Sequence, residues 1–123
     1  MSSYVVWLDS EKARIFKFVL GSIEKSTFER HEPSHHNPTH SDNKKNSNHF
    51  FHQLALLLVD AKEVLLMGPG QAKVQFKNHL EEHSHHQLAK AIVGVETVDH
   101  PTDPEVLRLA GDFFKHYDLF KKQ

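Results

Sequence analysis

The sequence predicts an α/β protein in which a mixed sheet of five strands carries helices on both faces. The N-terminal segments are short, β-branched and aromatic, and polar turns separate them, which is typical of antiparallel strands. Further along the chain, apolar patterns with a helical period alternate with short apolar segments, which indicates strands joined by helical crossovers. The predicted element order is β-β-β-α-β-α-β-α, and right-handed crossovers then place the strands in the order 3-2-1-4-5.

Three antiparallel strands are expected before residue 32. Residues 4–8 are β-branched and aromatic, as in a central strand. After a polar turn, residues 13–20 alternate between apolar and polar side chains, and a turn at Gly21 leads into residues 23–31. This third segment is more polar and carries charges, which suits the edge of a sheet because charged edges disfavour pairing with another chain.

The segment 32–48 contains no apolar residue and is predicted to be a long exposed loop rich in histidine. Loops of this length are uncommon in compact domains and often carry function. A disordered insertion is the alternative interpretation of the same composition.

A helix is expected over residues 47–61, because phenylalanines and leucines recur there at helical spacing. A buried strand should follow at 64–67. It ends at a corner, Gly68-Pro69-Gly70, where a second helical pattern begins at once and runs to about residue 82. This strand, turn and helix form the unit that identifies an α/β fold.

The C-terminal part predicts a short helical piece over 85–90, a strand over 91–98 and a last helix that runs to about residue 120. Thr102 and Glu105 have the spacing of a reciprocal capping box, and a proline lies between them in the first turn. These residues therefore predict a strong start for the last helix.

Composition limits the classes of function. With 123 residues the chain suits one domain, 1–123, and it has no cysteine for disulfides or thiolate metal sites. Neither a secretory signal nor an apolar run long enough to cross a bilayer is evident, so a cytoplasmic protein without membrane insertion is expected. The formal net charge is −1, and the 12 histidines would make the chain cationic in mild acid. Whether the protein forms homo-oligomers is left open.

The corner Gly68-Pro69-Gly70-Gln71-Ala72-Lys73, with Phe76 close behind, resembles the middle domain of Pelota and of the eukaryotic and archaeal peptide-chain release factors. Residues 95–103 are similar to bacterial single-domain relatives described as translational machinery proteins. The resemblance extends over nearly the whole chain. It implies a ribonuclease-H-like fold, in agreement with the strand order, and a role in translation.

In release factors, the loop that corresponds to 32–48 carries a Gly-Gly-Gln tripeptide that promotes hydrolysis of peptidyl-tRNA. This segment contains neither glycine nor glutamine, so a non-catalytic role is favoured, as for Pelota, which occupies stalled ribosomes. Lysines and histidines of the segment, together with the histidine that directly follows it, would then contact phosphates of ribosomal or other RNA. These candidate contacts are His35, His36, His40, Lys44, Lys45 and His49.

The Gly-Pro-Gly corner is also a candidate anion site. Gly68 and Gly70 place backbone amides at a helix N-terminus, and Lys73 lies one turn into the helix. A purely structural role, in which the glycines permit a tight turn and close packing, is the alternative.

Histidine clusters offer a second class of function, which is metal binding. His79 and His83 are four residues apart on one helix, and His86 follows three residues later, so these imidazoles could share Zn²⁺. The glutamates between the first two are misplaced for the His-Glu-x-x-His signature, which argues against a zinc hydrolase. A hydrolase that uses a histidine base is a weaker alternative, and the absence of a carboxylate in the first strand argues against a ribonuclease-H-type nuclease.

Overall fold

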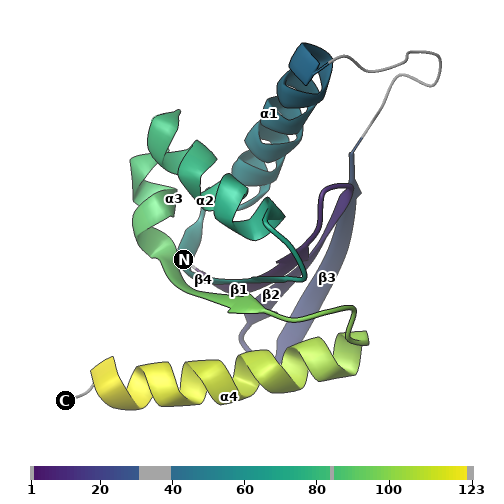
Figure 1. Ribbon diagram of the computed structural model, residues 1–123. Helices are drawn as coiled ribbons and strands as arrows, with labels where there is room; N and C mark the ends of the chain where they lie inside the picture. The colour runs from purple at the N-terminus through teal and green to yellow at the C-terminus, as the bar shows by residue number, and fades with distance from the viewer. Residues whose placement is uncertain (1, 31–39, 84, 122–123) are drawn as a thin grey trace.

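The computed structural model describes residues 2–30, 40–83 and 85–121, and within these ranges the chain forms a mixed sheet covered on both faces (Figure 1). The strands are β1 (Ser2–Leu8), β2 (Lys12–Val19), β3 (Ser22–Glu29), β4 (Ala61–Gly68) and β5 (Ile92–Thr97). The helices are α1 (His40–Leu57), α2 (Ala72–Glu82), α3 (His86–Ala91) and α4 (Asp103–Lys121).

The strand order is β3-β2-β1-β4-β5, which confirms the predicted fold class and topology. β1 pairs antiparallel with β2 and parallel with β4, while β2–β3 is antiparallel and β4–β5 is parallel. The hairpin strands therefore form one half of the sheet, and the strands reached through helices form the other half.

Alternation along β1 divides the core into two layers. Tyr4, Val6 and Leu8 pack under α1, α2 and α3, whereas Val5 and Trp7 face α4. Figure 1 shows α4 alone on its side of the sheet and the other helices together on the opposite side. Because both faces are covered, β1 and β4 are buried on both sides, and their sequences are accordingly almost continuously apolar.

The prediction of a long loop over residues 32–48 is wrong for its C-terminal part, because α1 already begins at His40. Residues 31–39 lie outside the described part of the chain. α1 also ends at Leu57, and β4 begins at Ala61, earlier than predicted. The N-terminal turns of α1 project beyond the sheet (Figure 1), so no apolar side chain is required there and the hydrophobic period gives no signal.

The capping box at the start of α4 is confirmed. The backbone N–H of Glu105 donates to Thr102 Oγ1 at 3.4 Å, and the Thr102 hydroxyl donates to Glu105 Oε1 at 2.9 Å. The backbone N–H of Thr102 completes the motif by donating to the same carboxylate at 3.3 Å. These hydrogen bonds lower the pKa of Glu105, chiefly through the Thr102 side chain.

Replacing Thr102 with alanine should lower the free energy of unfolding by about 1 kcal/mol, because the first turn of α4 loses its side-chain partner. Urea denaturation followed by circular dichroism measures the change, and Thr97→Ala at an exposed strand position is the control. Equal losses in the two variants would contradict a capping role.

Candidate functional site

The basic and histidine-rich segment predicted to contact RNA is only partly within the described residues. His35 and His36 lie outside them. His40, Lys44 and Lys45 belong to the N-terminal turns of α1, and an exposed His49 follows on the same helix. From residue 40 onward the segment is thus a helix end that projects from the sheet (Figure 1), where the sequence predicted a loop.

At the Gly-Pro-Gly corner, two of the three candidate anion-binding residues, Gly68 and Lys73, have a structural role. A side chain at Gly68 would place its Cβ 2.1 Å from the carbonyl oxygen of Leu8, so glycine is required for β4 to lie this close to β1. Lys73 is buried, and its ammonium donates to the carbonyl of Gly70 at 2.5 Å. An incoming anion would compete with that carbonyl for the lysine.

The predicted pair His79 and His83 does come together. Their rings stack with centroids 4.2 Å apart, and the ring of His85 lies 6.2 Å from that of His79. From α1, His52 contributes a fourth ring, 5.6 Å from that of His85. We call these four residues the histidine cluster. His86, which the sequence grouped with the first two, is instead an exposed residue at the start of α3.

Within the histidine cluster, His79 is buried against Phe51, and neither of its ring nitrogens has a hydrogen-bond partner among the described residues. Burial, followed by the charges that His83, His85 and His52 would carry, lowers its pKa to about 4. His79 is therefore neutral at physiological pH. Among the described residues, no three histidine or acidic side chains are arranged to hold a metal ion, so Zn²⁺ binding remains an untested prediction from the sequence.

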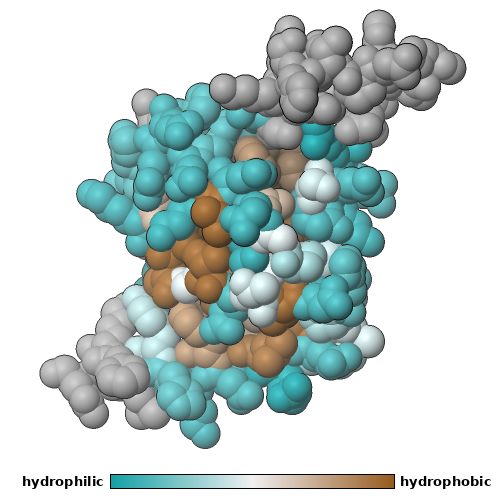
Figure 2. All heavy atoms as spheres, in the orientation of Figure 1, coloured by the Kyte–Doolittle hydropathy of each residue, from teal (hydrophilic) through white to brown (hydrophobic). Residues whose placement is uncertain are grey.

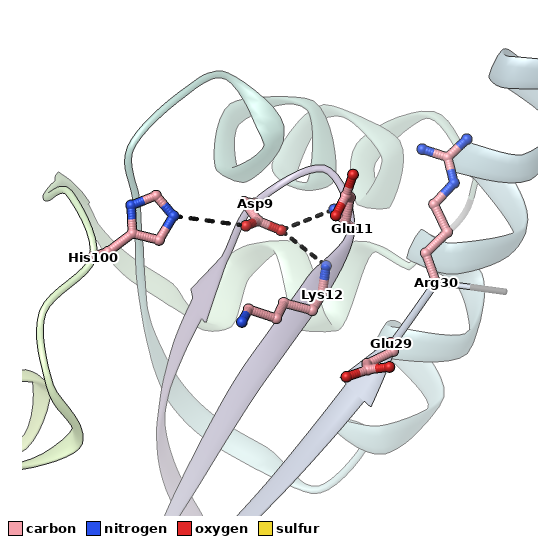
Figure 3. A pocket seen from close by; sticks show the side chains of 6 residues that line it. All are labelled: Asp9, Glu11, Lys12, Glu29, Arg30 and His100. Carbon is pink, nitrogen blue, oxygen red and sulfur yellow. Dashed lines mark hydrogen bonds and ion pairs between the residues drawn. The ribbon is translucent and has the colours of Figure 1, made fainter. Parts of the chain in front are cut away.

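A pocket of about 480 Å³ opens at the end of the sheet where β1 and β5 finish (Figure 3). We call it the carboxyl-edge pocket. It combines acidic, basic and imidazole side chains from the β1–β2 turn, the end of β3 and the segment after β5. Its lining residues are Asp9, Glu11, Lys12, Glu29, Arg30 and His100.

Asp9 organises one wall of the carboxyl-edge pocket. Its Oδ1 accepts the backbone N–H groups of Glu11 at 2.8 Å and Lys12 at 2.9 Å, which closes the turn between β1 and β2. Its Oδ2 lies 3.9 Å from Nε2 of His100, whose Nδ1 is 2.8 Å from Asp99 Oδ1. His100 is thus placed between two carboxylates, those of Asp9 and Asp99.

Trp7 and Arg14 fix the segment that carries His100. The indole N–H of Trp7 donates to the carbonyl of Asp99 at 2.8 Å, and the guanidinium of Arg14 lies 4.6 Å above the indole ring. The same guanidinium bonds Asp103 at 2.6 Å and the carbonyl of Pro101 at 2.9 Å. This network attaches the β5–α4 connection to the centre of the sheet.

Asp103 also pairs with Lys25, and these partners lower the pKa of its carboxyl group, Lys25 more than Arg14. Neither this network nor the carboxyl-edge pocket was predicted from the sequence. The sequence did contain a signal for the pocket, since polar residues such as Asp9 and His100 follow the strands β1 and β5. Ligand sites of open α/β sheets form at the carboxyl ends of strands.

No family model matches the chain, and no curated protein sequence matches it. Several solved structures do match the chain. Pelota from Archaeoglobus fulgidus aligns with a TM-score of 0.64 and 18% identity over 90% of this chain and 31% of its own. The archaeal translation termination factor aRF1 aligns with a TM-score of 0.59 and 17% identity over 96% of this chain and 40% of its own.

Dom34 from S. cerevisiae, a translation termination-like factor, aligns with a TM-score of 0.51 and 9% identity over 76% of this chain and 28% of its own. The chain thus spans about a third of the length of these proteins. Separately, no helix in the described ranges has both the length and the apolar character to cross a bilayer. At the level of the fold, the resemblance to the middle domain of Pelota and the archaeal release factors is confirmed.

Proposed function

We propose that this chain is a translation-associated protein that binds the ribosome or RNA without catalysing peptide release. The observation that carries the proposal is the fold, which is shared over 90% and 96% of the chain with Pelota and aRF1. Dom34 is a translation termination-like factor involved in RNA quality control pathways, and aRF1 is a translation termination factor. A related task in the cytoplasm is the simplest use of the same scaffold here.

The absence of glycine and glutamine from residues 32–48 supports a non-catalytic role, since the hydrolytic tripeptide of release factors has no counterpart in that segment. Lysines and histidines are present instead. The proposed contacts are His35, His36, His40, Lys44, Lys45 and His49.

The proposed contacts suit phosphate because lysine is a compact cation and imidazole gains charge in mild acid. Lys44 and Lys45 lie on the part of α1 that projects from the sheet (Figure 1). A projecting helix end can reach into a groove that the rest of a domain could not enter.

Ribosome co-sedimentation across a series of salt concentrations tests the proposal. Wild-type protein should pellet with ribosomes at low salt, and Lys44→Ala/Lys45→Ala should weaken binding. The slope of log affinity against log salt should fall in magnitude by about 2, because two phosphate contacts and their released counterions are lost.

Lys62→Ala/Lys90→Ala removes the same charge from two exposed positions on β4 and α3 and is the matched control. It should behave as wild type. Absence of wild-type pelleting at any salt concentration would overturn the proposal, and so would equal losses in the two double variants.

A further inference from the structure

A groove of about 370 Å³ lies where the turn from α1 into β4 meets α3. We call it the α3 groove. Leu88 and Ala91 of α3 are buried in it, Ala61 is half-buried, and Val59 stands at the rim with 75% of its surface exposed. On the face drawn in Figure 2, hydrophobic surface gathers beside α3.

The end of α1, which leads into the α3 groove, also carries exposed aliphatic residues. Leu56 and Leu57 are each 49% exposed and precede Val59 by a few residues. Aliphatic side chains exposed together on one surface mark interaction sites more often than single exposed ones do. The volume of the groove suits one or two apolar side chains of a partner.

The titratable side chains that line the α3 groove include two lysines and one aspartate, so positive charge is in excess there. Lys62 and Lys90 line it and are exposed. Asp60 lines it too, but its Oδ2 lies 3.1 Å from the ammonium of Lys17, and its Oδ1 accepts the hydroxyl of Tyr4 at 2.5 Å. These partners, Tyr4 first, hold the pKa of Asp60 below its ordinary value, so its charge is retained and internally neutralised. The lysines of the groove therefore favour a partner that carries negative charge.

We propose that the α3 groove docks a peptide segment of a partner protein in which aliphatic or aromatic residues are flanked by Asp or Glu. The apolar side chains fill the space against Leu88 and Ala91, and the acidic residues approach Lys62 and Lys90. This surface lies at the C-terminal end of α1, whereas the proposed RNA contacts lie at its N-terminal end. The two sites can therefore be occupied together and tested separately.

Selection of random linear peptides on the immobilised wild-type protein provides the probe. Enriched peptides should combine apolar residues with Asp or Glu, and their affinity should then be measured by fluorescence anisotropy. Lys62→Glu/Lys90→Glu should weaken binding by about tenfold or more, because attraction is replaced by repulsion. Val59→Ser, at a position too exposed to affect folding, should also weaken binding.

Lys44→Glu/Lys45→Glu carries the same charge change at the other end of α1 and should leave peptide affinity unchanged. This control keeps the docking proposal separate from the proposed function, since each pair of lysines is tested in an assay where the other is silent. Enrichment of peptides without acidic residues would overturn the proposal. Peptide affinities that are unchanged by the substitutions at Lys62, Lys90 and Val59 would also overturn it. Concentration-dependent dimerisation that Val59→Ser abolishes would also overturn it, by identifying the occupant as a second copy of the chain.

Discussion

Replacing Gly68 with alanine is expected to destabilise the protein by more than about 3 kcal/mol, a large part of the stability of a domain this size. The added Cβ would lie 2.1 Å from the carbonyl oxygen of Leu8, far inside van der Waals contact. That oxygen belongs to the backbone of β1, so no side-chain rotation relieves the overlap. The two central strands must separate, and β1 is buried on both faces.

Gly70→Ala is the matched control for this prediction, because nothing lies within 4 Å of the position that its Cβ would take. Its effect should stay within about 0.5 kcal/mol of wild type. Urea denaturation, followed by circular dichroism, gives both free energies of unfolding. Similar values for the two variants would show that the corner tolerates side chains and that the glycine at the strand end serves another purpose.

Acidification should remove up to about 3 kcal/mol of stability through His79 alone. Burial lowers the pKa of this imidazole from 6.5 to about 4, so the folded state favours the neutral ring. As the pH falls below 6.5, the unfolded chain binds the proton first and is stabilised relative to the folded chain. The contribution of His79 is therefore complete above pH 6.5 and is lost between 6.5 and about 4.

The groups that face His79 reinforce the direction of this effect. His83 and His85 from the end of α2 and the following turn, and His52 from α1, would add positive charge in acid, and Glu82 opposes them weakly. Asp60 and Asp103 have lowered pKa values, and the stability that they contribute is lost only at more acidic pH. Above the range in which carboxylates such as Glu105 titrate, the loss of stability between pH 6.5 and about 4 consequently reports on His79.

His79→Leu should flatten the pH profile of the free energy of unfolding in that interval without loss of stability at neutral pH. The leucine replaces a buried ring whose nitrogens have no hydrogen-bond partner in the part of the chain that the structure describes, so no hydrogen bond is given up there. His116→Leu, at an exposed position of α4, is the control and should keep the wild-type profile. A wild-type slope in His79→Leu would assign the acid sensitivity to other groups.

Local patterns in the sequence were sufficient for the strands, the Gly-Pro-Gly corner and the capping box, because each depends on residues that are near one another in the chain. The N-terminal turns of α1 could not be predicted in this way. Helices that project into solvent need no apolar stripe, and residues 40–48 contain no apolar residue. The hydrophobic period therefore reported only the part of α1 that touches the core.

In the candidate sites, too, contacts between residues near one another in the chain were predicted, and contacts that depend on tertiary packing were not. The pair His79 and His83 follows from helical spacing. The position of His52 depends on how α1 packs on α2, and that of His85 depends on the turn between α2 and α3. The carboxyl-edge pocket joins residues from opposite ends of the chain, such as Asp9 and His100. Its existence requires the strand order, which the sequence did predict, together with side-chain positions that it could not.

The single helix on one side of the sheet has a consequence for any shortened version of the chain. Among the described helices, only α4 packs on the layer that contains Val5, Trp7 and Met67, and it starts from a connection that Trp7 and Arg14 hold in place. Ending the chain before residue 103 would expose this aromatic and aliphatic layer to water. In Figure 1, the other described helices lie on the opposite side of the sheet and could not replace α4. The C-terminal helix is thus an obligatory part of the minimal folding unit rather than a dispensable tail.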